Sequence, residues 1–127
     1  MKFESVKTFA CEPDNVGVAR AWLTHQFSGQ RPDAPSSAVD DAELVVSELV
    51  TNAVRAGGSQ VTVHVLIEDE CVRIGVEDHA PGTPEQRVAA STDTSGRGLG
   101  IVDMVAADWG VRKIGTGKEV WAAIRLT

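Results

Sequence analysis

A carboxylate and a carboxamide stand four residues apart at Glu48 and Asn52, inside a run with strong helical periodicity. On a helix, residues at this spacing project from one face, one turn apart. The Asn oxygen is a neutral ligand of the kind that Mg²⁺ takes together with phosphate and water, and the Glu carboxylate can accept a proton. The pair is therefore able to hold a hard cation and polarise a hydroxyl, unless it is only the solvated face of an amphipathic helix.

A second carboxylate, Asp78, follows the alternating apolar residues of a predicted strand. At the exit of a strand, a carboxylate can accept hydrogen bonds from the exocyclic amine of adenine. The alternative is structural, because Asp is also a common initiator of turns. The residue type alone leaves both interpretations open.

Three glycines alternate over residues 96–100 (GRGLG), where the last helix is predicted to begin. Small residues let backbone amides approach a phosphate, and the dipole of a helix N-terminus favours the negative charge. The alternative is a flexible joint without a ligand. Residues 83–95 are rich in Ser and Thr and are predicted to form a lid loop of the kind that closes over ligands.

Signatures of several other chemistries are absent from the sequence. It has no G-x-x-x-x-G-K-[ST] phosphate loop, no G-x-G-x-x-G turn and no G-x-S-x-G nucleophile motif. Its three histidines and two cysteines do not have the spacing of metal ligands. The two cysteines do not make a disulfide framework, so a reducing, cytoplasmic compartment is expected.

Length and composition indicate one domain over residues 1–127, because a second independent core would leave each half too small to be stable. A hydrophobic fraction of 43% and a charged fraction of 24% are ordinary for a globular chain. The net charge of −6 argues against a nucleic-acid-binding surface. No apolar run approaches the roughly 18 residues of a membrane span, so neither nucleic acid nor a membrane is expected as a partner.

The elements that must position these residues follow from hydrophobic periodicity and turn signals. They are a strand at 2–10, a helix from Pro13-Asp14 to Ser28-Gly29, a helix from Ser37 to Gly57-Gly58, strands at 61–67 and 72–77, a helix at 98–108, and a hairpin of 109–115 with 118–126. An acid three residues after Ser37 predicts a capping box. Because the strands come in adjacent pairs, we expect a two-layer α/β sandwich, with a mixed but largely antiparallel sheet and helices on one face.

Three segments together resemble the GHKL ATP-binding superfamily, which includes gyrase B, sensor histidine kinases and anti-sigma-factor serine kinases. They are DAELVVSELVTNAVRAGG, VEDHAPG and GRGLGIVDMVAADWG, at residues 41–58, 76–82 and 96–110. The run ELVTNAVRAGG is most similar to the actinobacterial version of the anti-sigma-factor group. The resemblance implies the Bergerat ATP-binding fold over nearly the whole chain.

The resemblance also implies roles for individual residues. Asn52 would be the Mg²⁺ ligand, and Glu48 would polarise the attacking hydroxyl. Asp78 would contact the adenine amine, and Gly82 would lie in the turn beneath the nucleotide. These roles turn the three separate motifs into one expected binding site.

At the start of the last helix, Gly98, Leu99 and Gly100 would line the phosphates of ATP at the end of the lid. Arg97 is a candidate from its charge, because a cation there could face the γ-phosphate or a partner protein. Arg55 on the long helix is a second candidate for the same role, or else it forms a surface salt bridge.

Two segments depart from the family pattern. The second motif usually reads Asp-x-Gly-x-Gly, whereas this chain has Ala80 and Pro81 within it. Ala80 resists positive φ and Pro81 stiffens the turn, which predicts weaker nucleotide binding or a lid that hinges elsewhere. In the last hairpin many relatives have Thr near the nucleotide, but this chain has Lys118 followed by Glu119. Because a carboxylate repels phosphate, we expect Glu119 to point outward.

As a whole, the resemblance implies an ATP- and Mg²⁺-dependent serine/threonine protein kinase of the anti-sigma-factor type. Such a protein phosphorylates a STAS-like anti-sigma antagonist, and it holds a sigma factor until the unphosphorylated antagonist captures it. Relatives are commonly dimers, so a homodimer is a further expectation. Two alternatives stay open. One is an ATP-binding module with weak or no catalysis that acts by protein contacts, and the other is a detached histidine-kinase-like ATPase domain.

Overall fold

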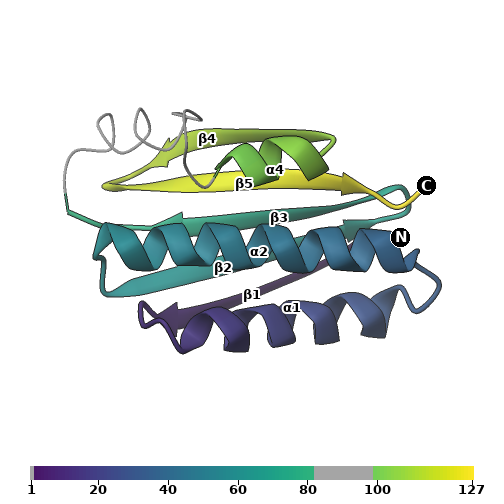
Figure 1. The fold of residues 1–127 in the computed structure, drawn as a ribbon, viewed down its shortest axis with the longest axis horizontal. Coiled ribbons are helices and arrows are strands. Elements are labelled where there is room, and N and C mark those ends of the chain that lie inside the picture. The colour runs from purple at the N-terminus through teal and green to yellow at the C-terminus, as the bar shows by residue number, and fades with distance from the viewer. Residues whose placement is uncertain (1, 82–98) are drawn as a thin grey trace.

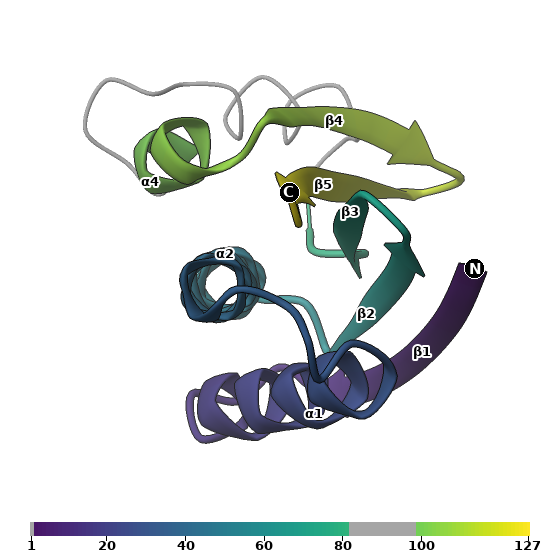
Figure 2. The ribbon, with the colours of Figure 1, turned by 90° about the vertical axis from the view of Figure 1, so that its right-hand side faces the viewer.

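The computed structural model describes residues 2–81 and 99–127. In chain order the elements are β1 (Lys2–Ala10), α1 (Asn15–Gln30), α2 (Ser36–Ala56), β2 (Gln60–Glu68), β3 (Cys71–Asp78), α4 (Leu99–Val105), β4 (Asp108–Ile114) and β5 (Gly117–Arg125). The strands form a sheet in the order β1-β2-β3-β5-β4, and every neighbouring pair is antiparallel. The described helices lie on one face of this sheet (Figure 1, Figure 2), so the predicted two-layer α/β sandwich is confirmed. No described helix is long and apolar enough to cross a membrane.

Alternation along the central strands decides which side chains meet the helices. Pairing of Val65 with Ile74, and of Ile74 with Ala122, puts these three residues on one face of the sheet. All three are almost completely buried, and the core forms where this face packs against the helices. The same alternation puts Asp78 and Lys118, which pair at one end of β3 and β5, on the helix side.

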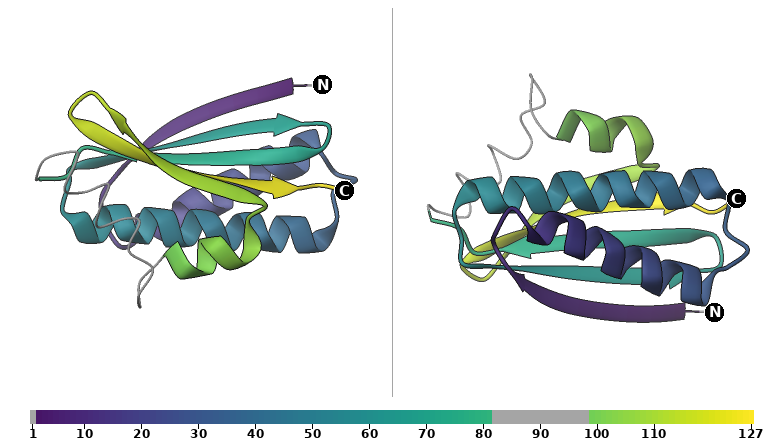
Figure 3. Two further views of the ribbon diagram at one scale, coloured as in Figure 1. Left: turned by 90° about the horizontal axis from the view of Figure 1, so that it is seen from above. Right: turned by 60° about the horizontal axis from the view of Figure 1, so that its bottom comes forward.

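The long helix α2 lies over the central strands, with α1 beside it (Figure 3). Its buried residues form one stripe toward the sheet: Ala38, Ala42, Val45, Val46, Leu49, Val50 and Ala53. The helix ends at Gly57, whose φ of +88° is a left-handed conformation that favours glycine. This stop agrees with the sequence prediction, and it turns the chain directly into β2.

The predicted capping box at the start of α2 is wrong. The helix begins at Ser36, one residue before the predicted cap Ser37. Pro35 precedes the first turn, and its carbonyl accepts the N–H groups of Ala38 and Val39. Ser37 therefore lies within the first turn, where its hydroxyl is not placed to cap the helix.

The ends of the two shorter helices also differ from the predicted bounds. α1 continues past the predicted stop at Ser28-Gly29, because the carbonyl of the fully buried Phe27 accepts the N–H of Arg31. α4 ends at Val105, three residues before its predicted end at residue 108. The N–H of Ala107 instead bonds to a carbonyl of β5, which draws the chain into the edge of the sheet.

Candidate functional site

Glu48 and Asn52 lie along one border of the buried stripe of α2. The opposite border faces α1, where Thr24 donates a hydrogen bond to the Glu43 carboxylate (Oγ1–Oε2 2.6 Å). Because a helix turns about 100° per residue, Glu48 and Asn52 are on the side away from α1, where α4 lies (Figure 2). Both are half-buried, and neither makes a hydrogen bond to a residue that the structure describes. Their oxygens are therefore sheltered and available to a ligand.

Asp78 ends β3 with its side chain on the helix side of the sheet. Only 2% of the residue is exposed. One carboxylate oxygen, Oδ1, accepts the N–H of Ala80 at 3.1 Å, as in a turn that Asp initiates. The other, Oδ2, lies 3.7 Å from Nζ of Lys118, which is also buried. Asp78 thus holds a turn and also places a negative charge in the interior, where a charge needs a partner of opposite sign or a ligand.

The end of α2 is in close contact with the turn after β3. A Cβ added to Gly58 would lie 3.2 Å from backbone atoms of Ala80, so the two segments approach at a distance that suits glycine. Ala80 is buried and does not adopt a positive φ. The departure from the family's glycine is therefore compatible with this turn, and Asp78 is placed near the end of the helix that carries Asn52.

The structure describes part of the predicted glycine-rich helix start. Leu99 is the first residue of α4 and is buried in the core, while a Cβ on Gly100 would meet nothing within 4 Å. Arg55 is exposed near the end of α2 and has no ion-pair partner among the described residues, so the predicted alternative of a salt bridge is not seen within them. Outside the described residues lie the predicted lid and Gly82, Arg97 and Gly98.

The sequence motifs predict no role for Lys118, although its ammonium lies beside Asp78 in the structure. The available signal was the alternation in the last strand, because Lys118 has the same parity as the buried residues Val120 and Ala122. A lysine at a buried position requires a counter-charge. The identity of that counter-charge depends on the pairing of β3 with β5, which only the structure shows.

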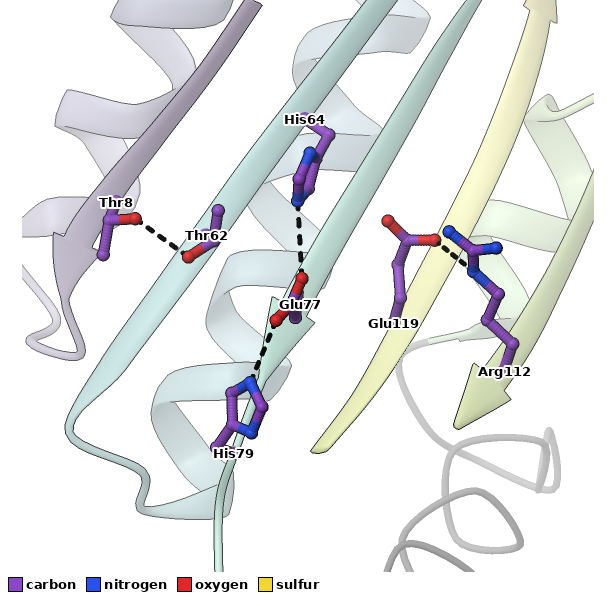
Figure 4. Close-up of polar contacts among 7 residues, drawn as sticks. All are labelled: Thr8, Thr62, His64, Glu77, His79, Arg112 and Glu119. Atoms are coloured by element: carbon purple, nitrogen blue, oxygen red, sulfur yellow. Dashed lines mark hydrogen bonds and ion pairs between the residues drawn. The ribbon is translucent and has the colours of Figure 1, made fainter. Parts of the chain in front are cut away.

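The helix-free face of the sheet carries a separate polar cluster (Figure 4). Glu77 lies between two histidines, with Oε2 2.9 Å from Nε2 of His79 and Oε1 3.5 Å from Nε2 of His64. On the same face, Arg112 donates a hydrogen bond to Glu119 (Nε–Oε1 2.8 Å). Glu119 therefore points away from the helix layer, which confirms the expectation drawn from its repulsion of phosphate.

Gly117 is expected not to tolerate a side chain. An added Cβ would collide with the backbone oxygen of Asp78 and would lie 2.6 Å from Nδ1 of His79. Because the backbone of a paired strand cannot rotate away, Gly117→Ala should lower the free energy of unfolding by about 1–3 kcal/mol, measured by urea denaturation. Gly29→Ala is the control, because its Cβ meets open space on α1 and should be neutral or stabilising. Equal stability of Gly117→Ala and the wild type would contradict the close approach.

Cys11 is half-buried and directly follows the end of β1. Burial first, and then the negative charge of Asp78, raise the pKa of the Cys11 thiol. Because the thiolate is the reactive form, alkylation of Cys11 by iodoacetamide should reach half-maximal rate at a higher pH in the folded chain than in urea. The same shift stabilises the fold below the unfolded pKa, and this contribution is lost as the pH rises through the folded pKa. If the alkylation midpoints of the folded and the unfolded chain coincide, the result would contradict the raised pKa of Cys11.

Comparisons with known proteins place the chain in a family. A family model described as "Histidine kinase-like ATPase domain" matches residues 9–124. A structure of the RsbU and RsbW domains of Rv1364c from Mycobacterium tuberculosis matches with a TM-score of 0.70 and 20% identity, over 98% of this chain and 32% of that chain. This chain therefore spans about a third of the length of that relative.

Two nucleotide-free structures of the catalytic domain of histidine kinase ThkA also match. Their TM-scores are 0.54 and 0.51, each at 16% identity, and they cover 97% of this chain and 97% and 99% of those chains. At such identities the solved structures show a common fold. A search of curated proteins finds no match. Because the family model covers most of the sequence and the fold agrees with these relatives, the chain belongs to the histidine kinase-like ATPase domain family, within the GHKL superfamily.

Proposed function

We propose that the chain binds ATP between α2, the end of β3 and the start of α4. The observation that carries the proposal is the buried Asp78 carboxylate, held between Ala80 and Lys118 near the end of α2. In the proposed complex this carboxylate accepts a hydrogen bond from the adenine amine. Membership of an ATPase domain family supports an adenine nucleotide as the ligand.

Asn52 of α2 is the side chain proposed to hold a magnesium ion. Asn52 offers a neutral oxygen that is half-buried and makes no hydrogen bond to a described residue, and such an oxygen is a suitable Mg²⁺ ligand. When bound, the ion would neutralise charge on the phosphates. The chain needs this local cation, because its net charge of −6 opposes the approach of a polyanion.

The phosphates are proposed to lie against the glycine-rich segments. Backbone amides there would line the nucleotide, at Gly82, Gly98, Leu99 and Gly100. Arg97 would face the γ-phosphate or a partner protein. Arg55, exposed on α2, is the second candidate for that role.

Glu48 is proposed as the base for phosphoryl transfer. The acceptor hydroxyl attacks the γ-phosphorus, the bond from that phosphorus to the β–γ bridging oxygen breaks, and ADP leaves. Glu48 takes the hydroxyl proton during the attack. Its carboxylate makes no hydrogen bond to a described residue, so its lone pairs are available for that proton.

The proposed acceptor is a serine or threonine of a STAS-like anti-sigma antagonist, and the second proposed partner is a sigma factor. Similarity of fold to a structure that contains an RsbW domain supports a kinase of the anti-sigma-factor type. In this scheme the chain holds the sigma factor until the unphosphorylated antagonist captures it. Phosphorylation of the antagonist then reverses the exchange.

Transfer of a labelled γ-phosphate to such an antagonist tests the proposed activity. The expected product is acid-stable, because phosphoserine survives acid and phosphohistidine does not. Acid-labile label would favour a histidine-kinase-like domain, the candidate that the ThkA matches support. Nucleotide binding without any label transfer would favour a binding module, which the replacement of the family's glycine by Ala80 supports.

A further inference from the structure

A buried lysine faces the carboxylate that is proposed to bind the base. Lys118 is 5% exposed, and its Nζ lies 3.7 Å from Oδ2 of Asp78, which is 2% exposed. The two residues are direct neighbours across β3 and β5. Replacement of a buried ion pair by apolar residues is often neutral or stabilising, because burial removes both charges from water. Stability alone therefore gives little reason for this pair, which points to a role in recognition.

The pair presents a hydrogen-bond donor beside an acceptor. A carboxylate only accepts and an ammonium only donates. The separation of 3.7 Å between Nζ and Oδ2 is longer than a charge-assisted hydrogen bond of about 2.7–2.9 Å. The N–H of Ala80 fixes the carboxylate from its other oxygen. A flat ligand edge that contacts both groups would therefore not have to break a short hydrogen bond between them.

Adenine has the complementary pattern on its Watson–Crick edge. Its N6 amine donates and the adjacent N1 accepts, whereas guanine in the same position has O6 as an acceptor and N1–H as a donor. Guanine would therefore oppose the carboxylate with an acceptor and the ammonium with a donor. We infer that Lys118 is a specificity-determining residue that donates to N1 of adenine and excludes guanine. This inference rests on the proposed binding of the adenine amine at Asp78.

The chain offers a matched control for the charge of Lys118. Lys113 is its register partner on β4 and is exposed. Lys113→Met therefore removes the same charge from the same hairpin and keeps both residues of the buried pair. An effect that comes from general attraction of a polyanion would appear in both variants, whereas base recognition is expected only from Lys118.

Calorimetric titration with three nucleotides tests the inference. In 1-deaza-ADP a C–H group replaces N1, so the wild type should bind it roughly 10- to 150-fold more weakly than ADP. In Lys118→Met the two ligands should bind within about threefold of each other, since the donor is gone. Lys113→Met should keep the wild-type ratio. GDP should bind the wild type at least roughly 100-fold more weakly than ADP.

The inference would be overturned if Lys118→Met kept the wild-type ratio of affinities for ADP and 1-deaza-ADP. Equal wild-type affinities for ADP and GDP would also overturn it. Lys118→Met leaves the Asp78 carboxylate buried without this ammonium, so thermal melting must show that the variant is folded. If it is unfolded, Lys118→Gln replaces it, because its amide can also offer a carbonyl to guanine N1–H. The preference for ADP over GDP should then fall at least roughly tenfold, and an unchanged preference would reject the assignment. If the wild type binds none of these nucleotides, the proposed function itself is rejected.

Discussion

Glu48→Gln is expected to lower the rate of phosphoryl transfer to the antagonist by roughly 10²- to 10⁴-fold. Gln has nearly the shape of Glu but cannot take the proton of the attacking hydroxyl. Glu48 is half-buried on the side of α2 away from α1 and makes no hydrogen bond to a described residue, so the fold does not depend on its charge. The affinity for ADP should therefore stay within about threefold of the wild type. Single-turnover transfer of labelled phosphate, with calorimetric titration of ADP, measures both quantities.

Glu43→Gln is the control for this variant. Glu43 is on the same helix, but its carboxylate accepts a hydrogen bond from Thr24 of α1, and a Gln carbonyl can replace it there. The transfer rate of Glu43→Gln should equal that of the wild type. A rate for Glu48→Gln within about tenfold of the wild type would show that Glu48 is not the base.

Asp78→Asn is expected to reduce both stability and nucleotide binding. The substitution leaves the Lys118 ammonium buried without the carboxylate that lies 3.7 Å away, and removal of one partner from a buried pair costs about 3–5 kcal/mol. The free energy of unfolding in urea should fall by that amount. The affinity for ADP should fall by roughly 30- to 150-fold, because an ionised hydrogen-bond partner of the base is lost.

A double variant separates these two effects. Asp78→Asn combined with Lys118→Met removes both charges, so its stability should recover toward that of the wild type while its ADP affinity stays low. Glu77→Gln is the control for removal of a carboxylate from β3, since Glu77 faces the helix-free side and contacts His79 there. If the free energy of unfolding of Asp78→Asn lies within about 1 kcal/mol of the wild-type value, the result would contradict the buried ion pair.

The faces of the central strands could be predicted because side chains alternate with a period of two. The apolar positions Val61, Val63, Val65 and Ile67 are all buried, as their spacing indicates. The length and the stop of α2 were also predictable, since its apolar stripe is continuous and Gly57 supplies the left-handed residue. These features depend on local sequence alone, and the same periodicity puts Glu48 and Asn52 on one face of α2.

Features that depend on contacts distant in sequence were not predicted. β3 pairs with β5, and this pairing brings Lys118 beside Asp78. Local periodicity shows that a residue is buried, but it does not show which strand lies next to it. The start of α2 differs for a local reason, because the backbone of Pro35 accepts the first N–H groups and the nearby serines do not cap. Residue type alone does not show which group accepts the first N–H groups of the helix.

Calorimetric titration of ATP into the wild type and into Asn52→Ala, with and without Mg²⁺, is the sharpest test of the proposed nucleotide site. The wild type should bind ATP, and Mg²⁺ should tighten this binding. In Asn52→Ala, the tightening should be roughly 30- to 150-fold smaller, because one ligand of the ion is gone. Wild-type binding that is the same with and without Mg²⁺ would contradict the role of Asn52. No binding of ATP at all would contradict the nucleotide site itself.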